Sequence, residues 1–282
     1  MTGSAFESVL RRDRLVVVAS LVGLCLLSWL FLIHLALQME TMEGMAARMM
    51  SMPVRDTVST LLATALSPGA AALADATVNF ALVALMWAVM MVGMMMPSAA
   101  PTILLFSALQ RKRTATDRIG GRTAPFVAGY FAIWTAFSIA AAAAQTALAH
   151  AGLTSMQMAT TSAALGGALF IAAGLFEFTP LKDRCLIHCR SPLEWIPRHM
   201  RPGRFGAFRM GVEHGTYCVG CCWALMLLLF VGGVMNLIWV AVLAAIVLVQ
   251  KVLPGGVVLA RVAGLVLVVC GIAVLAWPLI FA

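Results

Sequence analysis

Charged residues are scarce in this sequence. They make up 11% of its 282 residues, whereas a soluble globular domain carries roughly 25%. Hydrophobic residues make up 62%, and the mean hydropathy is +0.99. This composition excludes an ordinary soluble domain. It predicts an all-α, polytopic bundle of transmembrane helices whose main solvent is the lipid bilayer.

Acidic residues are the scarcest charges, with 11 Asp and Glu against 19 Lys and Arg, and the formal net charge is +8. On a soluble protein this excess would suggest a nucleic-acid partner. Here, 17 of the basic residues fall in four clusters between apolar runs, at 11–14, 111–122, 182–209 and 251–261. The positive-inside rule places all four clusters in the cytoplasm and leaves only Arg48 and Arg55 outside, so no nucleic acid is expected as a partner.

A cleavable signal sequence is also lacking. The first apolar run, Leu15 to Leu37, is long enough to span a membrane and has no small-residue cleavage site, so we expect it to remain as a helix. Seven apolar stretches of spanning length predict a multi-pass protein of the bacterial inner membrane. They cover about 15–37, 78–109, 124–149, 158–179, 212–232, 236–252 and 257–280.

This count puts the N-terminus in the cytoplasm and the C-terminus outside, in one integral membrane domain over residues 1–282. A Met-rich segment, 38–77, is then extracytoplasmic, and a segment bearing Cys and His, 180–211, is cytoplasmic. The fifth and sixth helices lie so close in sequence that Gly232 and Gly233 must form a tight turn between them.

Five of the seven cysteines lie in two short segments that this topology places at the cytoplasmic face. The candidate ligands there are Cys185, His188 and Cys189 in "CLIHC", and His214, Cys218, Cys221 and Cys222 in "HGTYCVGCCW". Spacings of three and four residues put such side chains on one face of a helix. A reducing cytoplasm does not preserve structural disulfides, so disulfides explain this clustering poorly. Thiolates select Cu(I), and thiolates with imidazole also suit Zn(II).

The cysteines have alternative roles that the sequence leaves open. Buried cysteines often act as small hydrophobic side chains, which is our interpretation of the isolated Cys25 and Cys270. The Cys218-Val-Gly-Cys221 spacing also occurs in thiol-disulfide oxidoreductases. A structural subunit of a membrane complex is a third alternative, and the sequence predicts no catalytic residue.

Methionines and a few polar residues complete the candidate site. Met91 and Met95, in the Met-rich second stretch, are either soft thioether ligands or flexible core filler. Ionisable groups near a membrane are usually paired. We therefore expect either a polar site beside the metal or interfacial ion pairs at Glu177, Glu213, Gln250 and Lys251.

Three blocks of sequence resemble a known family. They are "WAVMMVGMMMPSAAP" (Trp87 to Pro101), "TPLKDRCLIHCRSP" (Thr179 to Pro192) and "GVEHGTYCVGCCWALMLLLFVGGVMN" (Gly211 to Asn236). The chain is similar, from about Phe80 to Gly256, to a bacterial family of predicted metal-binding integral membrane proteins, a domain of unknown function. The resemblance implies shared positions at Met90, Met91, Met94, Met95, Pro97, Cys185, Cys189, Arg190, Pro192, His214, Cys218, Cys221, Cys222 and Trp223.

Two pairs of residues depart from the family pattern. The relatives have Tyr-Gln where this chain has Phe176-Glu177, and Glu-Lys where it has Gln250-Lys251. A carboxylate that changes places with an amide predicts contact between Glu177 and Gln250, with Lys251 or Arg261 as the basic partner.

Together these patterns predict a membrane protein that binds a metal ion, Cu(I) or alternatively Zn(II), through cysteines and histidines at the cytoplasmic face. Whether it transports, senses, stores or inserts the metal is left open. We also expect a membrane or metallochaperone partner that exchanges the metal with it.

Overall fold

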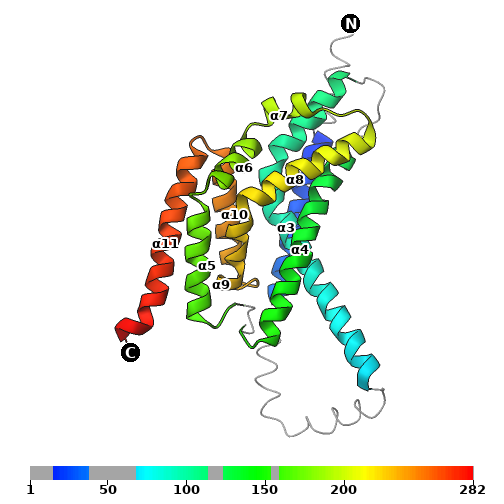
Figure 1. The fold of residues 1–282 in the computed structure, drawn as a ribbon. Coiled ribbons are helices and arrows are strands. Elements are labelled where there is room, and N and C mark those ends of the chain that lie inside the picture. Colours follow the sequence, from blue (N-terminus) through cyan, green and yellow to red (C-terminus); the bar gives the residue numbers. More distant parts are fainter. Residues whose placement is uncertain (1–14, 38–67, 114–122, 154–158, 282) are drawn as a thin grey trace.

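The computed structural model describes residues 15–37, 68–113, 123–153 and 159–281, and these residues form an all-helical bundle (Figure 1). The all-α prediction is therefore confirmed, and the described ranges contain no β-strand. The first described helix is Leu15–Leu37. The others are α3 Pro68–Arg113, α4 Thr123–His150, α5 Ala163–Phe176, α6 Pro180–Arg190, α7 Pro192–His199, α8 Gly203–Leu227, α9 Leu229–Gly232, α10 Leu237–Val252 and α11 Gly256–Phe281.

Five spans among the described residues are long and apolar enough to cross a membrane. They are Leu15–Leu37, Phe80–Gln110, Thr123–His150, Gly203–Gly232 and Gly256–Ala276. A spanning helix needs about 20 residues, but α5 has 14 and α10 has 16. The predicted count of seven spans is therefore not confirmed. The count is five, or up to six if α5 and α6 form one broken span.

The predicted fourth span, 158–179, is shorter at both ends in the structure, because α5 begins after its cap at Ser162 and the chain breaks between α5 and α6. The chain bends by 65° at this break, between the axis of α5 and the axis of α6. The Thr179 hydroxyl accepts a hydrogen bond from the Lys182 backbone N–H, and Pro180 occupies the first turn of α6. A side-chain cap followed by proline starts a new helix, so the apolar run does not continue straight.

Other helix limits also differ from the predicted ones. α3 begins at Pro68, so residues 68–77 of the predicted outer segment are helical, while 38–67 lie outside the described residues. The predicted cytoplasmic segment 180–211 consists of α6, α7 and the start of α8. The tight turn after α9 is confirmed. Gly233 has a φ of 89°, and the Asn236 side chain caps α10 through the Trp239 backbone N–H.

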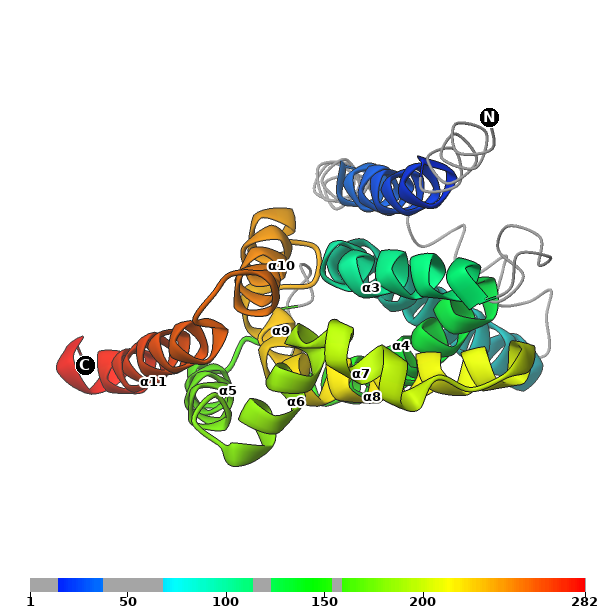
Figure 2. The same ribbon diagram turned by 90° about the horizontal axis from the view of Figure 1, so that it is seen from above.

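Glycines bring the backbones of α4 and α8 into direct contact. A Cβ atom added at Gly129 would collide with the Phe208 carbonyl, and one at Gly211 would collide with the Phe126 carbonyl. Small residues at a helix interface allow this close approach. Seen from above, α3, α4 and α8 form one group, α5 and α11 form a pair, and α10 lies between them (Figure 2). The helix Leu15–Leu37 lies beside α3.

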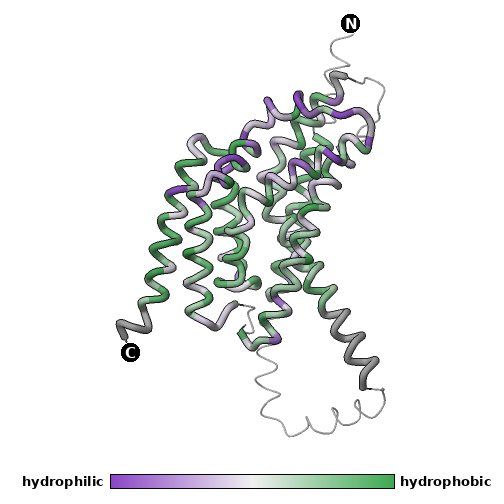
Figure 3. Tube along the Cα trace, viewed as in Figure 1, coloured by the Kyte–Doolittle hydropathy of each residue, from purple (hydrophilic) through white to green (hydrophobic). Residues whose placement is uncertain are grey.

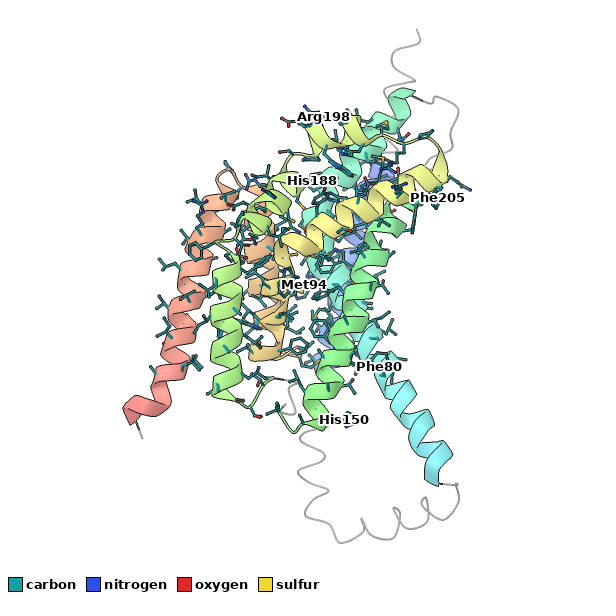
Figure 4. The ribbon with its side chains drawn as sticks, in the orientation of Figure 1. Phe80, Met94, His150, His188, Arg198 and Phe205 are labelled. Carbon is teal, nitrogen blue, oxygen red and sulfur yellow. The ribbon has the colours of Figure 1, made fainter. Side chains whose placement is uncertain are left out.

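Hydrophilic residues gather at one end of the bundle, over α6, α7 and the start of α8 (Figure 3). The remaining length of the long helices is mostly hydrophobic. His188 and Arg198 lie toward the hydrophilic end, and His150 lies at the opposite end (Figure 4). The two cysteine-bearing segments therefore belong to helices that begin at or near the hydrophilic end.

Candidate functional site

The helix α8 carries three cysteines into the interior of the bundle. Cys218, Cys221 and Cys222 are each at most 2% exposed. Spacings of three and four residues place Cys221 and Cys222 one turn after Cys218. Both of their thiols donate to the Cys218 carbonyl, with Sγ–O distances of 3.1 and 2.9 Å. The predicted helical face of cysteines therefore exists and points inward.

A fourth cysteine comes from α6. The Sγ atoms of Cys189 and Cys221 are 4.0 Å apart, although the residues are 32 positions apart in sequence. A disulfide would require about 2.05 Å, so these are free thiols. One metal with two sulfur bonds of about 2.3 Å can link sulfurs up to about 4.6 Å apart. The Cys189–Cys221 separation therefore suits two sulfur ligands of a single ion.

Cys185 lies one turn before Cys189 on α6 and packs against α8 at a different point. A Cβ atom added at Gly220 would come within 2.8 Å of the Cys185 Sγ. The absence of a side chain at Gly220 therefore makes room for this sulfur.

A lysine and a tyrosine lie against the α8 cysteines. The Lys251 Nζ, on α10, donates to the Cys218 Sγ at 2.9 Å and is 4.0 Å from the Cys222 Sγ. The Tyr130 hydroxyl, on α4, is 3.0 Å from the same Cys218 sulfur. A buried ammonium is costly unless an anion accompanies it, and the cysteine sulfurs are the nearest groups that can carry a negative charge. We call Cys189, Cys218, Cys221 and Cys222 the thiol cluster.

His214 lies beside the thiol cluster in an aromatic surrounding. Its ring packs 5.7 Å from the Tyr130 ring and 5.7 Å from the Trp195 ring, measured between centroids. His188 stacks on Tyr217 at 3.6 Å. Among the described residues, His188 Nε2 and His214 Nδ1 are buried nitrogens without a hydrogen-bond partner. Both imidazoles therefore keep one nitrogen uncommitted.

A second buried polar cluster meets α10 at Gln250, the residue before Lys251. The Lys182 Nζ donates to Glu177 Oε1 at 2.6 Å and to Gln250 Oε1 at 2.8 Å. The Gln250 amide donates to Glu177 Oε2 at 2.9 Å, which confirms the predicted contact between Glu177 and Gln250. We call these three residues the carboxylate cluster. All three are at most 2% exposed.

The predicted basic partner of the carboxylate cluster was wrong. Lys182, from the first turn of α6, occupies that place. Lys251 faces the thiols instead, because consecutive residues of a helix point about 100° apart. Arg261 pairs with Asp183 at 3.3 Å.

The two buried polar clusters lie within a range that matches a known family. Residues 84–274, about two thirds of the chain, match the model of the PpoB2 family, which is described as copper chaperones. The chain belongs to the PpoB2 family. No curated protein and no solved structure matches it. The family match confirms the expectation of a metal-related family.

Not every predicted ligand of this PpoB2-family chain lies in the thiol cluster. Within the described ranges, no three or more His, Cys, Asp or Glu side chains are arranged as a group that could hold a metal ion. Met91 and Met95, on α3, are fully buried in the hydrophobic core of the bundle. His188 and His214 belong to the aromatic surrounding, and Cys185 lies against Gly220. Of the predicted ligands, the structure therefore brings together mainly the sulfurs of α6 and α8.

Glu213 lies apart from both buried clusters in this PpoB2-family chain. Its carboxylate is 2.7 Å from the Arg201 guanidinium and 3.7 Å from that of Arg209. Its side chain is 27% exposed, so it belongs to a partly exposed ion pair, in keeping with the ion-pair alternative that the sequence left open. Sequence reasoning missed Tyr130 and Lys182. Tyr130 lies in the first turns of α4 and Lys182 in the first turn of α6, where a polar side chain is unremarkable without knowledge of its neighbours.

Proposed function

We propose that this protein is an integral protein of the bacterial inner membrane that binds Cu(I) at the thiol cluster and passes it to a partner. The observation that carries the proposal is the approach of the Cys189 and Cys221 sulfurs to 4.0 Å, with Cys218 adjacent. The description of the PpoB2 family as copper chaperones supports copper as the cargo. The five long apolar helices support the membrane location.

The number of converging ligands favours Cu(I) over Zn(II). Structural zinc sites use four ligands in a tetrahedron. Cu(I) is a softer ion that accepts two thiolates, and thiolate ligands select it. Within the described part of the chain, a pair of close sulfurs with no third preformed ligand suits Cu(I) better. A site with few ligands also releases its ion readily to an incoming thiol, which is what delivery requires.

The charge distribution supports a cytoplasmic position for the thiol cluster. The basic residues of α6, α7 and the start of α8 lie at the hydrophilic end of the bundle (Figure 3). The positive-inside rule assigns that end to the cytoplasm. α11 runs away from that end to the C-terminus, which the proposal places outside (Figure 1). The cluster then meets a cytoplasmic donor or acceptor of copper.

The test is Cu(I) binding by the purified full-length protein in detergent, without oxygen and in competition with a Cu(I)-specific chelator. Cys189→Ser and Cys221→Ser are each expected to weaken Cu(I) binding by about 100-fold or more, because one of two thiolate ligands is lost. Cys270→Ser is the matched control, since Cys270 is an exposed free thiol on α11. Wild-type affinity in the Cys189→Ser/Cys221→Ser double variant would contradict the proposal.

The thiol-disulfide alternative has one observation in its favour, because the Cys189 and Cys221 sulfurs are close enough to form a disulfide after a small shift. Counting reactive thiols in denatured protein, before and after mild reduction, separates the two functions. Copper handling predicts the same count in both samples once copper has been removed. An oxidoreductase isolated in its oxidised form would gain two thiols on reduction.

A further inference from the structure

Lys251 supplies a fixed positive charge beside the thiol cluster. Its side chain is 8% exposed, and its Nζ reaches Cys218 Sγ at 2.9 Å, Ser98 Oγ at 3.4 Å and Cys222 Sγ at 4.0 Å. Among the described residues, the contacts of this ammonium are therefore two sulfurs and a hydroxyl, with no carboxylate. Lys182, the other buried lysine, already has the Glu177 carboxylate at 2.6 Å. Of the two buried lysines that the structure describes, Lys251 is thus the one whose charge faces sulfurs and no carboxylate.

The charge of a metal–thiolate complex depends on the valence of its metal. When two thiols bind a metal, each loses its proton to solvent and contributes one negative charge. A monovalent ion then leaves a complex of charge −1, whereas a divalent ion on the same two thiolates leaves a neutral complex. For any one set of thiolates, the monovalent complex carries one more negative charge. A cation a few ångströms away therefore stabilises it relative to the divalent complex.

We propose that Lys251 determines the valence preference of the thiol cluster, so that its ammonium balances the charge of a two-thiolate complex of a monovalent soft metal ion and disfavours divalent ions. The inference rests on the proposed function, because it assumes that the thiols bind a metal. It adds a specificity-determining role for a residue that does not itself bind the metal. The hydroxyl of Ser98 and the sulfur of Cys218 hold the ammonium at this place.

The experiment compares two soft ions that differ in valence, Ag(I) and Cd(II), which separates valence from softness. The ratio of the two dissociation constants is measured for the wild type, Lys251→Met, Lys251→Gln and Lys251→Arg in detergent. Both neutral variants are expected to reduce the preference for Ag(I) over Cd(II) by about tenfold or more. Lys251→Arg keeps the charge and is expected to stay within about threefold of the wild type. Arg261→Gln, which removes a positive charge from an exposed ion pair, is the matched control and should leave the ratio unchanged.

The possible results separate this inference from the proposed function. An unchanged ratio in folded Lys251→Met and Lys251→Gln would overturn the role of Lys251, even if the wild type binds Cu(I) through its cysteines. A wild-type protein without cysteine-dependent Cu(I) binding would overturn the proposed function itself.

If neither neutral variant folds, X-ray absorption of the wild-type protein loaded with Cu(I) decides the matter. Two sulfur neighbours around copper are expected. Three or more would remove the charge balance on which the role of Lys251 depends.

Discussion

Two of the lysines that the structure describes are buried, and they have chemically different partners. Lys182 contacts a carboxylate and an amide, which also bond to each other. Lys251 contacts the sulfur of Cys218 and the hydroxyl of Ser98. Carboxylate oxygens are hard ligands that hold an ammonium well, whereas a thiolate prefers a soft metal ion. The carboxylate cluster therefore balances its own charge, whereas the cation beside the thiol cluster contacts sulfur and hydroxyl groups and no carboxylate among the described residues.

The largest effect is expected at Lys182. Lys182→Met leaves the Glu177 carboxylate buried without a cation, which is expected to destabilise the protein by about 3–5 kcal/mol. The measurement is thermal unfolding in detergent, followed by fluorescence-detected size exclusion. Adding Glu177→Leu removes both charges and is expected to recover most of the loss. An unchanged melting temperature in Lys182→Met would show that the carboxylate cluster is not a structural unit.

A smaller effect tests whether Glu177 and Gln250 act together. Glu177→Gln removes the anion beside Lys182, and Gln250→Glu in the same chain returns a carboxylate within reach of the same ammonium. A double-mutant cycle of unfolding free energies is expected to give a coupling of about 1–3 kcal/mol. Additive losses would mean that the two side chains contribute independently.

Tyr130 tests the same comparison at the thiol cluster. Tyr130→Phe removes the hydroxyl that lies 3.0 Å from the Cys218 sulfur and is expected to cost about 1 kcal/mol of stability. Cu(I) affinity should change by less than about tenfold, because the hydroxyl is not a ligand. Tyr217→Phe is the natural control, since the chain has only two tyrosines and Tyr217 stacks on His188. A loss of Cu(I) binding in Tyr130→Phe alone would make the phenol part of the metal site.

The smallest effect is expected at the exposed ion pair of Arg261 and Asp183. Their side chains are 57% and 24% exposed, and the atoms are 3.3 Å apart. Exposed pairs contribute roughly 0–1 kcal/mol. Arg261→Gln should therefore shift the unfolding transition only slightly and leave Cu(I) binding unchanged. A large destabilisation would show that this end of α11 matters as much as the carboxylate cluster does.

The sequence predicted those features that depend on composition and on neighbouring residues. Low charge and long apolar runs predicted the helical bundle, and adjacent glycines predicted the turn at Gly233. Cysteine spacing predicted the buried face of α8. The count of seven spans is not confirmed, because α5 and α10 are shorter than a simple span, and hydropathy does not register the Ser162 and Asn236 caps at which they begin.

The partners of the two lysines could not be predicted, because they depend on how whole helices are oriented. Gln250 and Lys251 are adjacent, yet one faces the carboxylate cluster and the other the thiol cluster. Only the rotation of α10 about its axis decides which residue faces which cluster. The approach of Cys189 to Cys221 likewise depends on the 65° bend before α6.

The glycine contact between α4 and α8 has a mechanical consequence for the thiol cluster. With the two backbones touching at Gly129 and Gly211, neither helix can slide or rotate without a collision, so Tyr130 and Cys218 travel together as one rigid frame. α10 contacts these two helices at Cys218 through the Lys251 side chain, which is long and flexible. The α4–α8 contact is therefore the rigid side of the thiol cluster, and a movement that loosens the Cys218–Lys251 contact has to come from α10 or from the Lys251 side chain.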